Sequence, residues 1–211
     1  MQFGVDEAGK GPVLGSMFAA AVRADPSVLP DGVDDSKRLS DENRERLAAK
    51  LRSDSRIDVG IAEITATRID GEADMNTLTV AAHAEAVAPI VEDGDVGVCD
   101  AGDVDAGRFA RRVGDRIDAE AVVRASHGAD AEEPLVSAAS VIAKSARERH
   151  VSVLSERYGD VGSGYPSDPT TRTFLREYLE ANGELPPPAR RSWSTCADLR
   201  SAAEQSDLGE F

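Results

Sequence analysis

Short segments with apolar residues at every second position, or with a brief apolar run, divide the chain into five predicted β-strands. They cover residues 2–7, 17–23, 57–61, 95–100 and 119–124. In the third segment Ile57, Val59 and Ile61 alternate with other residues, which suggests a strand.

Apolar residues at helical spacing predict helices between and after these strands. Ser40, followed by two acidic residues, is a good helix start, and Leu47 and Leu51 form an apolar pair one turn apart. Further helices are expected over residues 76–91, 109–117, 134–146 and 170–181. Three strands followed by helices that alternate with two more strands predict an α/β fold with a mixed sheet.

Net charge affects which partners we expect. The 211-residue chain has 39 acidic and 24 basic residues, a formal net charge of −15. An acidic surface normally argues against a nucleic-acid partner, because phosphate contacts need Lys and Arg. However, an acidic chain that is poor in lysine and rich in alanine and valine is typical of a salt-rich cytoplasm. At about 1 M salt the Debye length is roughly 3 Å, so net charge does not exclude nucleic acid there.

The location of the protein follows from features that the sequence lacks. No apolar run of about 18 residues occurs, so no transmembrane helix is expected. The N-terminus shows no signal-peptide pattern. Cys99 and Cys196 suit a reducing compartment. We expect a monomeric, cytoplasmic protein without a membrane partner.

Residues 4–11, Gly-Val-Asp-Glu-Ala-Gly-Lys-Gly, partly fit the spacing of a phosphate-binding loop. Gly11, however, stands where that loop needs Ser or Thr, and Asp6 and Glu7 occupy the path of the phosphate. Two carboxylates repel a polyanion unless a cation lies between them. The segment is therefore not a nucleotide cradle, and an anion is expected to arrive there together with metal.

Carboxylates end two of the predicted strands. Asp6 and Glu7 end the first strand, and Asp100 ends the fourth. A carboxylate that continues an apolar strand face is costly to bury, and a metal ion offsets that cost. Neighbouring strand residues point to opposite faces, so Asp6 and Glu7 converge only if the strand bends, which the glycines that follow would allow. Oxygen ligands of this kind favour Mg²⁺ or Mn²⁺.

Five motifs resemble, in family order, those of type 2 ribonuclease H (ribonuclease HII), and its archaeal branch fits best. They are Asp-Glu-Ala-Gly-Lys-Gly-Pro from Asp6, where the family usually has Arg for Lys; Asp35-Ser36-Lys37 with Leu39; Cys99-Asp100-Ala101; Asp130 with Pro134 and the segment to Lys144; and Gly162-Ser163-Gly164-Tyr165-Pro166-Ser167-Asp168. Each motif alone is weak, but together they span residues 3–193.

The resemblance implies a ribonuclease H-like fold, a mixed five-stranded sheet flanked by helices with a C-terminal helical cap. It implies a catalytic domain over residues 1–160, a substrate-contacting cap over 161–200 and a disordered tail over 201–211. The acidic, lysine-poor composition further suggests a halophilic source.

The resemblance also implies that Asp6, Glu7, Asp100 and Asp130 are catalytic and bind Mn²⁺ or Mg²⁺. Asp130 is assigned over its acidic neighbours by its four-residue spacing to Pro134. The implied reaction is cleavage of RNA in an RNA–DNA hybrid, or 5′ to a ribonucleotide embedded in duplex DNA, which leaves 5′-phosphate and 3′-hydroxyl ends. Two ions about 4 Å apart would activate water and assist the leaving oxygen.

Further residues are implied as substrate contacts. They are Gly9, Lys10, Gly11, Lys37, Lys144 and Tyr165. The loop backbone would contact the 2′-hydroxyl, which alone distinguishes RNA from DNA at a given sugar, and Tyr165 would pack on the next, deoxy sugar. For Lys144 a structural ion pair is an equal alternative. Four arginines are further candidates for the nucleic-acid path: Arg172, Arg176, Arg190 and Arg191.

Three other interpretations stay open. A ribonuclease H-like junction resolvase would not need the Gly9–Gly11 and Gly164–Tyr165 pair. A type 3 ribonuclease H carries an additional N-terminal domain, whereas the first strand here starts at residue 2. A non-catalytic metal-binding or nucleic-acid-binding module would show no metal-dependent cleavage. A sliding clamp is a candidate partner, although the acidic tail after Ser201 shows no docking motif.

Overall fold

The computed structural model describes residues 1–33, 39–71 and 73–208. Contacts group the chain into two compact units. Unit 1 comprises Met1–Ala8, Phe18–Glu63 and Asp74–Arg147, and unit 2 comprises Gly9–Met17, Ile64–Ala73 and Glu148–Phe211. These units differ from the predicted boundaries at residues 160 and 200, because two short N-terminal segments pack with the C-terminal part of the chain.

Unit 1 is built on a five-stranded sheet with the order β3-β2-β1-β4-β5. The strands are β1 (Gln2–Ala8), β2 (Met17–Ala24), β3 (Asp58–Ile64), β4 (Val96–Asp100) and β5 (Val122–Ser126). β1 pairs antiparallel with β2 and parallel with β4, and β4 pairs parallel with β5. The sheet is therefore mixed, as the sequence predicted.

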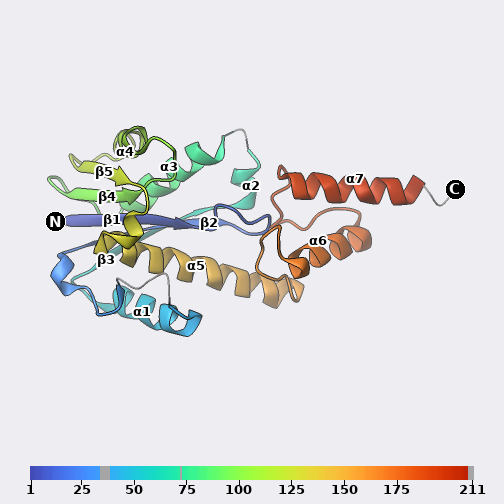
Figure 1. Ribbon diagram of the computed structural model, residues 1–211, viewed down its shortest axis with the longest axis horizontal. Coiled ribbons are helices and arrows are strands. Elements are labelled where there is room, and N and C mark those ends of the chain that lie inside the picture. Colours follow the sequence, from blue (N-terminus) through green and yellow to red (C-terminus); the bar gives the residue numbers. More distant parts are fainter. Residues whose placement is uncertain (34–38, 72, 209–211) are drawn as a thin grey trace. The chain divides into compact units, whose positions relative to one another are not determined.

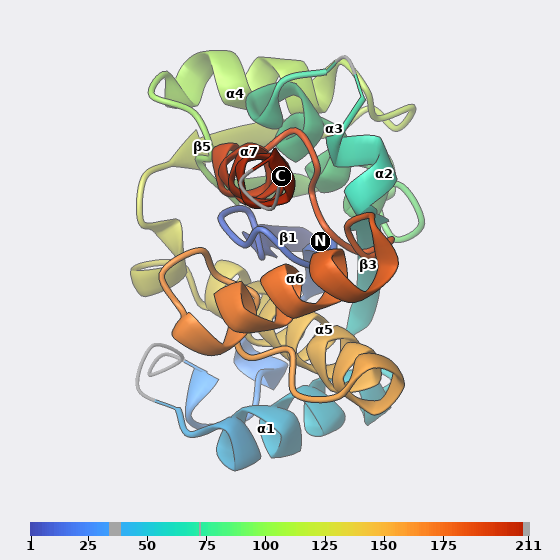
Figure 2. The same cartoon turned by 90° about the vertical axis from the view of Figure 1, so that its right-hand side faces the viewer.

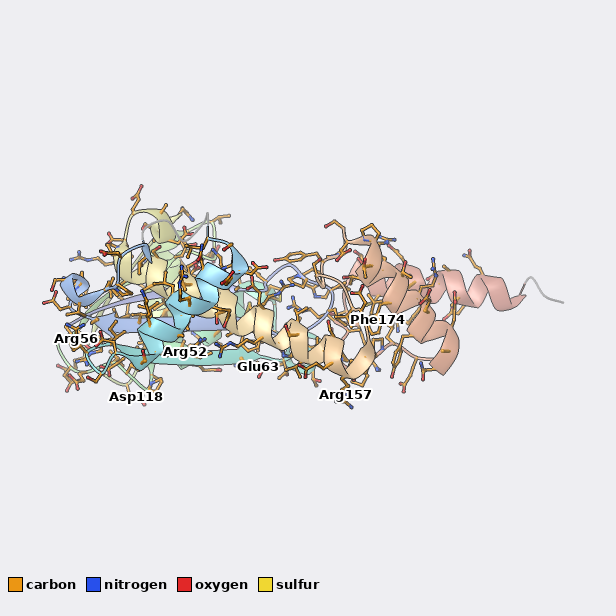
Figure 3. The ribbon with its side chains drawn as sticks, turned by 90° about the horizontal axis from the view of Figure 1, so that it is seen from below. Arg52, Arg56, Glu63, Asp118, Arg157 and Phe174 are labelled. Atoms are coloured by element: carbon orange, nitrogen blue, oxygen red, sulfur yellow. The ribbon has the colours of Figure 1, made fainter. Side chains whose placement is uncertain are left out.

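Helices cover both faces of this sheet. They are α1 (Asp41–Ser53), α3 (Met75–Val87), α4 (Ala106–Gly114) and the first part of α5 (Pro134–Tyr158). α3 and α4 lie over one face, and α1 and α5 lie over the other (Figure 1). Figure 3 labels Arg52 on α1. Its Nη1 donates to the Ser145 hydroxyl on α5 at 3.2 Å. The Ser40 side chain caps α1, as expected for that helix start.

Two glycines allow close packing within unit 1. A Cβ on Gly4 of β1 would lie 2.2 Å from the backbone of Leu135, at the start of α5. A Cβ on Gly97 of β4 would lie 2.0 Å from the ring of Phe3. Larger residues would therefore push α5 and Phe3 away from the strands. This close approach sets the first turns of α5 directly against β1, the strand that carries Asp6.

The third predicted strand is confirmed as β3, and burial alternates along it. Gly60 and Ala62 lie on the buried face, whereas Ile61 is 43% exposed. The cause is close packing, because a Cβ on Gly60 would lie 1.9 Å from the carbonyl oxygen of Ala86 in α3. Ile57 and Val59 pack against the apolar cluster on the other side. The alternation predicted the strand, but Ile61 does not share their burial.

Unit 2 contains α2 (Ala66–Ile69), the end of α5, α6 (Pro169–Asn182) and α7 (Ser194–Leu208). Figure 2 shows α7 end-on and α6 from the side. Its apolar core consists of Val13, Leu14, Leu154, Val161, Leu175, Leu179, Leu185, Ala189 and Cys196. Residues from both ends of the chain therefore share one core.

The C-terminal segment also differs from the sequence-based expectation. α7 continues to Leu208, so residues 201–208 are helical where a disordered tail was expected. Among the described residues, no helix is long and apolar enough to cross a membrane.

Candidate active site

Four carboxylates of unit 1 come from neighbouring elements, and we call Asp6, Glu7, Asp100 and Asp130 the carboxylate edge. β1 and β4 are parallel neighbours with Val5 opposite Cys99, so the next residues along the two strands are Asp6 and Asp100. Asp130 lies in a short 3₁₀ turn (Ala129–Ala131) that follows β5. Parallel strands end at the same side of a sheet, which explains why residues so distant in sequence meet here.

The negative charges of these carboxylates raise the pKa values of their neighbours. Asp6 is 5% exposed, and burial together with the charges of Glu7 and Asp100 raises its pKa to about 7. The pKa of Asp100 is also raised, first by burial and then by Asp130 and Glu7. The N–H of Ala129 donates to Asp100 at 2.8 Å and partly opposes this shift. Negative charge is thus concentrated at the carboxylate edge.

The predicted bend between Asp6 and Glu7 is absent. β1 keeps its regular register with β2 through both residues and on to Ala8. Asp6 lies beside the Ser140 hydroxyl of α5, which lowers its pKa slightly, whereas Glu7 reaches His83 of α3. The two side chains therefore leave the strand on opposite faces, as a regular strand requires. Their charges still interact at the strand end.

His83 is a site residue that the sequence did not reveal. It is fully buried, and its Nε2 lies 2.7 Å from Glu7 Oε2. Its ring meets Phe109 edge-on, with centroids 5.0 Å apart. Burial disfavours the charged form, but neighbouring Cys99 and the hydrogen bond to Glu7 outweigh it and raise the pKa of His83 to about 10. A protonated His83 donates to Glu7 and fixes the direction of that carboxylate.

The second group of predicted residues belongs to unit 2, and we call residues 9–15 the glycine loop. Gly9 has a φ of 86°, a conformation that favours glycine. A Cβ on Gly11 would lie 3.5 Å from Tyr165 Cε1, so the loop backbone runs directly alongside that ring. The N–H groups of Val13 and Leu14 both donate to the Gly164 carbonyl, at 2.8 and 3.2 Å. The structure thus brings the Gly9–Gly11 and Gly164–Tyr165 motifs together.

The remaining predicted contacts have different placements. Lys10 is half-buried in the glycine loop. Lys144 is half-buried on α5, four residues after Ser140 and therefore on the same side of that helix. Lys37 lies outside the described residues. Arg190 is fully buried, so it does not line a nucleic-acid path, in contrast to the expectation from sequence.

The donor chemistry of the carboxylate edge fits a hard divalent ion. Carboxylate oxygens are the ligands that Mg²⁺ and Mn²⁺ prefer. A cation would offset the burial and mutual repulsion that raise the pKa of Asp6 and Asp100. Within the described part of the chain, no three acidic, histidine or cysteine side chains are already arranged to hold a metal ion.

Comparison with known proteins identifies the family of the chain. The family model for ribonuclease HII matches residues 3–196. The ribonuclease HII of Haloarcula marismortui is 63% identical over 100% of both chains. The crystal structure of ribonuclease H2 from Pyrococcus horikoshii is 36% identical, with a TM-score of 0.89 over 97% of this chain and 99% of that one.

A further solved structure, the PCNA:RNase HII complex from Archaeoglobus fulgidus, is also 36% identical. Its TM-score is 0.84 over 95% of this chain and 97% of that chain. The motifs, the mixed sheet flanked by helices and the full-length similarity all lead to one assignment. The chain belongs to the ribonuclease HII family and is an endoribonuclease of the ribonuclease H type.

Proposed function

We propose that this enzyme cuts the RNA strand of RNA–DNA hybrids and also cuts 5′ to ribonucleotides embedded in duplex DNA, leaving 5′-phosphate and 3′-hydroxyl ends. The observation that carries the substrate assignment is the position of Gly11 beside the Tyr165 ring, where a Cβ on Gly11 would lie 3.5 Å from Tyr165 Cε1. A backbone without a side chain allows a ribose to approach closely, and an aromatic face offers an apolar contact to a deoxyribose. This pair suits a junction between the two sugars.

The catalytic role of the carboxylate edge is the second part of the proposal. Asp6, Glu7, Asp100 and Asp130 would hold Mg²⁺ or Mn²⁺. When bound, such ions activate water and stabilise the charge that develops on the phosphate. His83 orients the Glu7 carboxylate, and the Ala129 N–H orients Asp100.

The lysines are proposed to act on the phosphates. Lys10 and Lys144 are half-buried cations in a chain with few lysines, and Lys37 is assigned by its motif alone. A lysine supplies a flexible point charge rather than a planar fork, which suits attraction to a phosphate more than exact placement. The lysine charges would thus strengthen binding of the nucleic-acid backbone, while the backbone of the glycine loop would discriminate ribose from deoxyribose.

Further aspects of the setting are proposals of the same kind. A monomer in a salt-rich cytoplasm fits the acidic composition, and Cys99 and Cys196 are both buried free thiols, as in a reducing compartment. The Archaeoglobus fulgidus structure is named as a complex with PCNA, which supports a sliding clamp as a partner of this chain.

The test is cleavage of a DNA duplex that contains one ribonucleotide, at molar KCl with Mn²⁺ or Mg²⁺. We expect a single cut 5′ to the ribonucleotide, with none in an all-DNA duplex and none with Asp6→Asn. If the folded wild-type protein binds the duplex but never cuts it, the binding-module interpretation replaces the proposal. Cleavage of the all-DNA control would favour a nuclease of the resolvase type.

A further inference from the structure

Among the residues that the structure describes, Arg190 is the largest fully buried side chain, and it lies in unit 2, between α6 and α7 in the sequence. Its guanidinium donates to three backbone carbonyls of the glycine loop. Nε donates to Gly15 at 2.9 Å, Nη1 to Lys10 at 2.9 Å and Nη2 to Gly9 at 2.6 Å. One side chain therefore holds both ends of this loop.

The arrangement has a physical reason. Arginine stays charged under all relevant conditions, so burying it requires hydrogen-bond acceptors around the planar fork. The loop carbonyls supply them, and the guanidinium carbon also lies 5.3 Å from the centroid of the Trp193 ring. The backbone N–H of Arg190 donates to the Val13 carbonyl at 2.8 Å, which ties the same residue to the loop a fourth time. Arg190 and the loop stabilise each other.

The direction of these bonds determines where the loop amides point. The peptide bonds are trans, and in a trans peptide the C=O and N–H groups point in opposite directions. With the Gly9 and Lys10 carbonyls turned toward Arg190, the N–H groups of Lys10 and Gly11 are turned away from it. These two donors belong to the backbone segment that runs beside Tyr165.

We propose that Arg190 is a positioning residue for substrate recognition, because it holds the Gly9 and Lys10 carbonyls so that the Lys10 and Gly11 amides face the 2′-hydroxyl of the ribonucleotide. This inference rests on the proposed function. In this proposal the backbone amides of Lys10 and Gly11 discriminate between ribose and deoxyribose. The buried guanidinium of Arg190 fixes their orientation from the opposite side of the loop.

Lysine cannot replace arginine in this role. A lysine ammonium donates from one atom, whereas the guanidinium reaches Gly9, Lys10 and Gly15 from three separate nitrogens. Arg190→Lys therefore keeps the charge and loses the geometry, and Arg190→Met loses both. Arg157 is the matched control, since it also belongs to unit 2, is exposed on α5 outside the loop, and has its guanidinium carbon 5.1 Å from the centroid of an aromatic ring, that of Tyr158.

The experiment compares Arg190→Lys, Arg190→Met and Arg157→Met on a duplex that contains four consecutive ribonucleotides. We expect wild type and Arg157→Met to cut at one position at the RNA–DNA junction. Both Arg190 variants should cut about ten- to a hundredfold more slowly, a loss typical of a misplaced substrate, and at scattered positions. Free guanidinium should restore rate and position in Arg190→Met, which simple destabilisation would not show.

A second readout does not depend on cleavage. Amide hydrogen exchange of residues 9–17 should accelerate in both Arg190 variants while exchange of the unit 1 strands stays unchanged. Scattered cutting together with faster exchange supports the proposal. Unchanged cut position in a folded Arg190 variant, or unchanged exchange, overturns it and leaves the proposed function standing. A wild-type protein that never cuts refutes the proposed function, and the exchange result then still decides whether Arg190 orders the loop.

Discussion

The carboxylate edge of unit 1 and the glycine loop of unit 2 differ in how their charged groups are neutralised. At the edge, negative side chains lie close enough to raise the pKa of Asp6 and Asp100, so the chain leaves their repulsion for an external cation to relieve. In the loop, a positive side chain is buried and its donors are satisfied by backbone carbonyls. The first region is incomplete by itself, and the second is complete before any ligand arrives.

This difference suits the two roles proposed for these regions, metal-assisted hydrolysis at the carboxylate edge and sugar recognition at the glycine loop. A site that awaits metal gains binding energy from relief of repulsion, because each carboxylate is stabilised when the cation binds. A site that reads a sugar hydroxyl needs donors already fixed in place, because rigid donors lose little entropy on binding. Substitutions in the two regions should therefore change different observables.

The largest expected effect is that of Asp100→Asn. The substitution removes the negative charge of one proposed metal ligand. The cleavage rate should fall by about 10³-fold or more, since metal ions stabilise the transition state by several kcal/mol. Discrimination by the glycine loop should persist, so binding of an uncleaved ribonucleotide duplex should still exceed binding of all-DNA duplex. Gel-shift and cleavage assays measure the two effects, and equal loss of both would remove the distinction between the regions.

The next effect concerns pH and metal-free stability. The folded-state pKa of Asp6 is about 7, whereas an unfolded Asp titrates near 4. The folded state thus keeps this proton up to a higher pH than the unfolded state does. The contribution of Asp6 to the free energy of unfolding therefore falls as pH rises from about 4 to about 7. Asp6→Asn should remove this loss and stabilise the protein by a few kcal/mol, on the order of 1.4 per pKa unit, at neutral pH in chelator. Denaturant unfolding tests this, and a less stable variant would contradict it.

His83→Gln tests whether the edge depends on an oriented Glu7. We expect Mn²⁺ affinity to fall about 10- to 100-fold, as for partners that orient metal ligands elsewhere. Calorimetric titration with Mn²⁺ gives the value. Phe109→Leu is the control, because it alters the packing of the His83 ring and leaves the hydrogen bond to Glu7 in place. Equal weakening in both variants would show a packing effect only.

Gly11→Ala makes the converse test in the loop. Its Cβ would lie at an ordinary contact distance of 3.5 Å from Tyr165, so folding stability should change little. The methyl group occupies the space proposed for the ribose, so cleavage at a ribonucleotide should fall about tenfold or more. Gly9→Ala differs, because its positive φ should cost about 1 kcal/mol of stability. Thermal unfolding and cleavage rates compare the two variants. A stable, fully active Gly11→Ala would contradict the proposed close approach of the ribose to Gly11.

Lys10→Arg should have the smallest effect, less than about threefold on the cleavage rate. Arg190 binds position 10 through the backbone carbonyl oxygen, and lysine and arginine side chains both carry the positive charge. Steady-state cleavage with Mn²⁺ and with Mg²⁺ measures the change. A large gain on restoring arginine would mean that side-chain contacts, rather than backbone, dominate recognition.

Motif spacing and strand patterning were sufficient for the sheet and for the placement of the carboxylates. Asp6 and Glu7 lie among the last paired residues of β1, which runs to Ala8, and Asp100 ends β4; strand ends are visible as breaks in alternation. The orientation of Asp6 and Glu7 was not predictable from the glycines that follow, because the strand continues to Ala8 before the chain turns. Their catalytic assignment stays a prediction until cleavage is measured.

The residues that support the site were not predictable, because each acts through a partner distant in sequence. His83 meets Glu7 across 76 positions, and Arg190 meets Gly9 across 181. Local patterns report burial, and both residues sit in segments whose patterns indicate an apolar helix or an exposed turn. Only the three-dimensional packing shows that a histidine and an arginine are enclosed there.

The link between Arg190 and the glycine loop also has a consequence for synthesis. Lys10 and Arg190 lie 180 positions apart, so the loop completes its hydrogen bonds only when nearly the whole chain has been made. All four carboxylates are already present by Asp130. If the carboxylates and the loop act as proposed, a chain interrupted between these points would carry the groups for hydrolysis without an ordered surface that selects the sugar. Discrimination between RNA and DNA would then depend on synthesis of the C-terminal segment that contains Arg190.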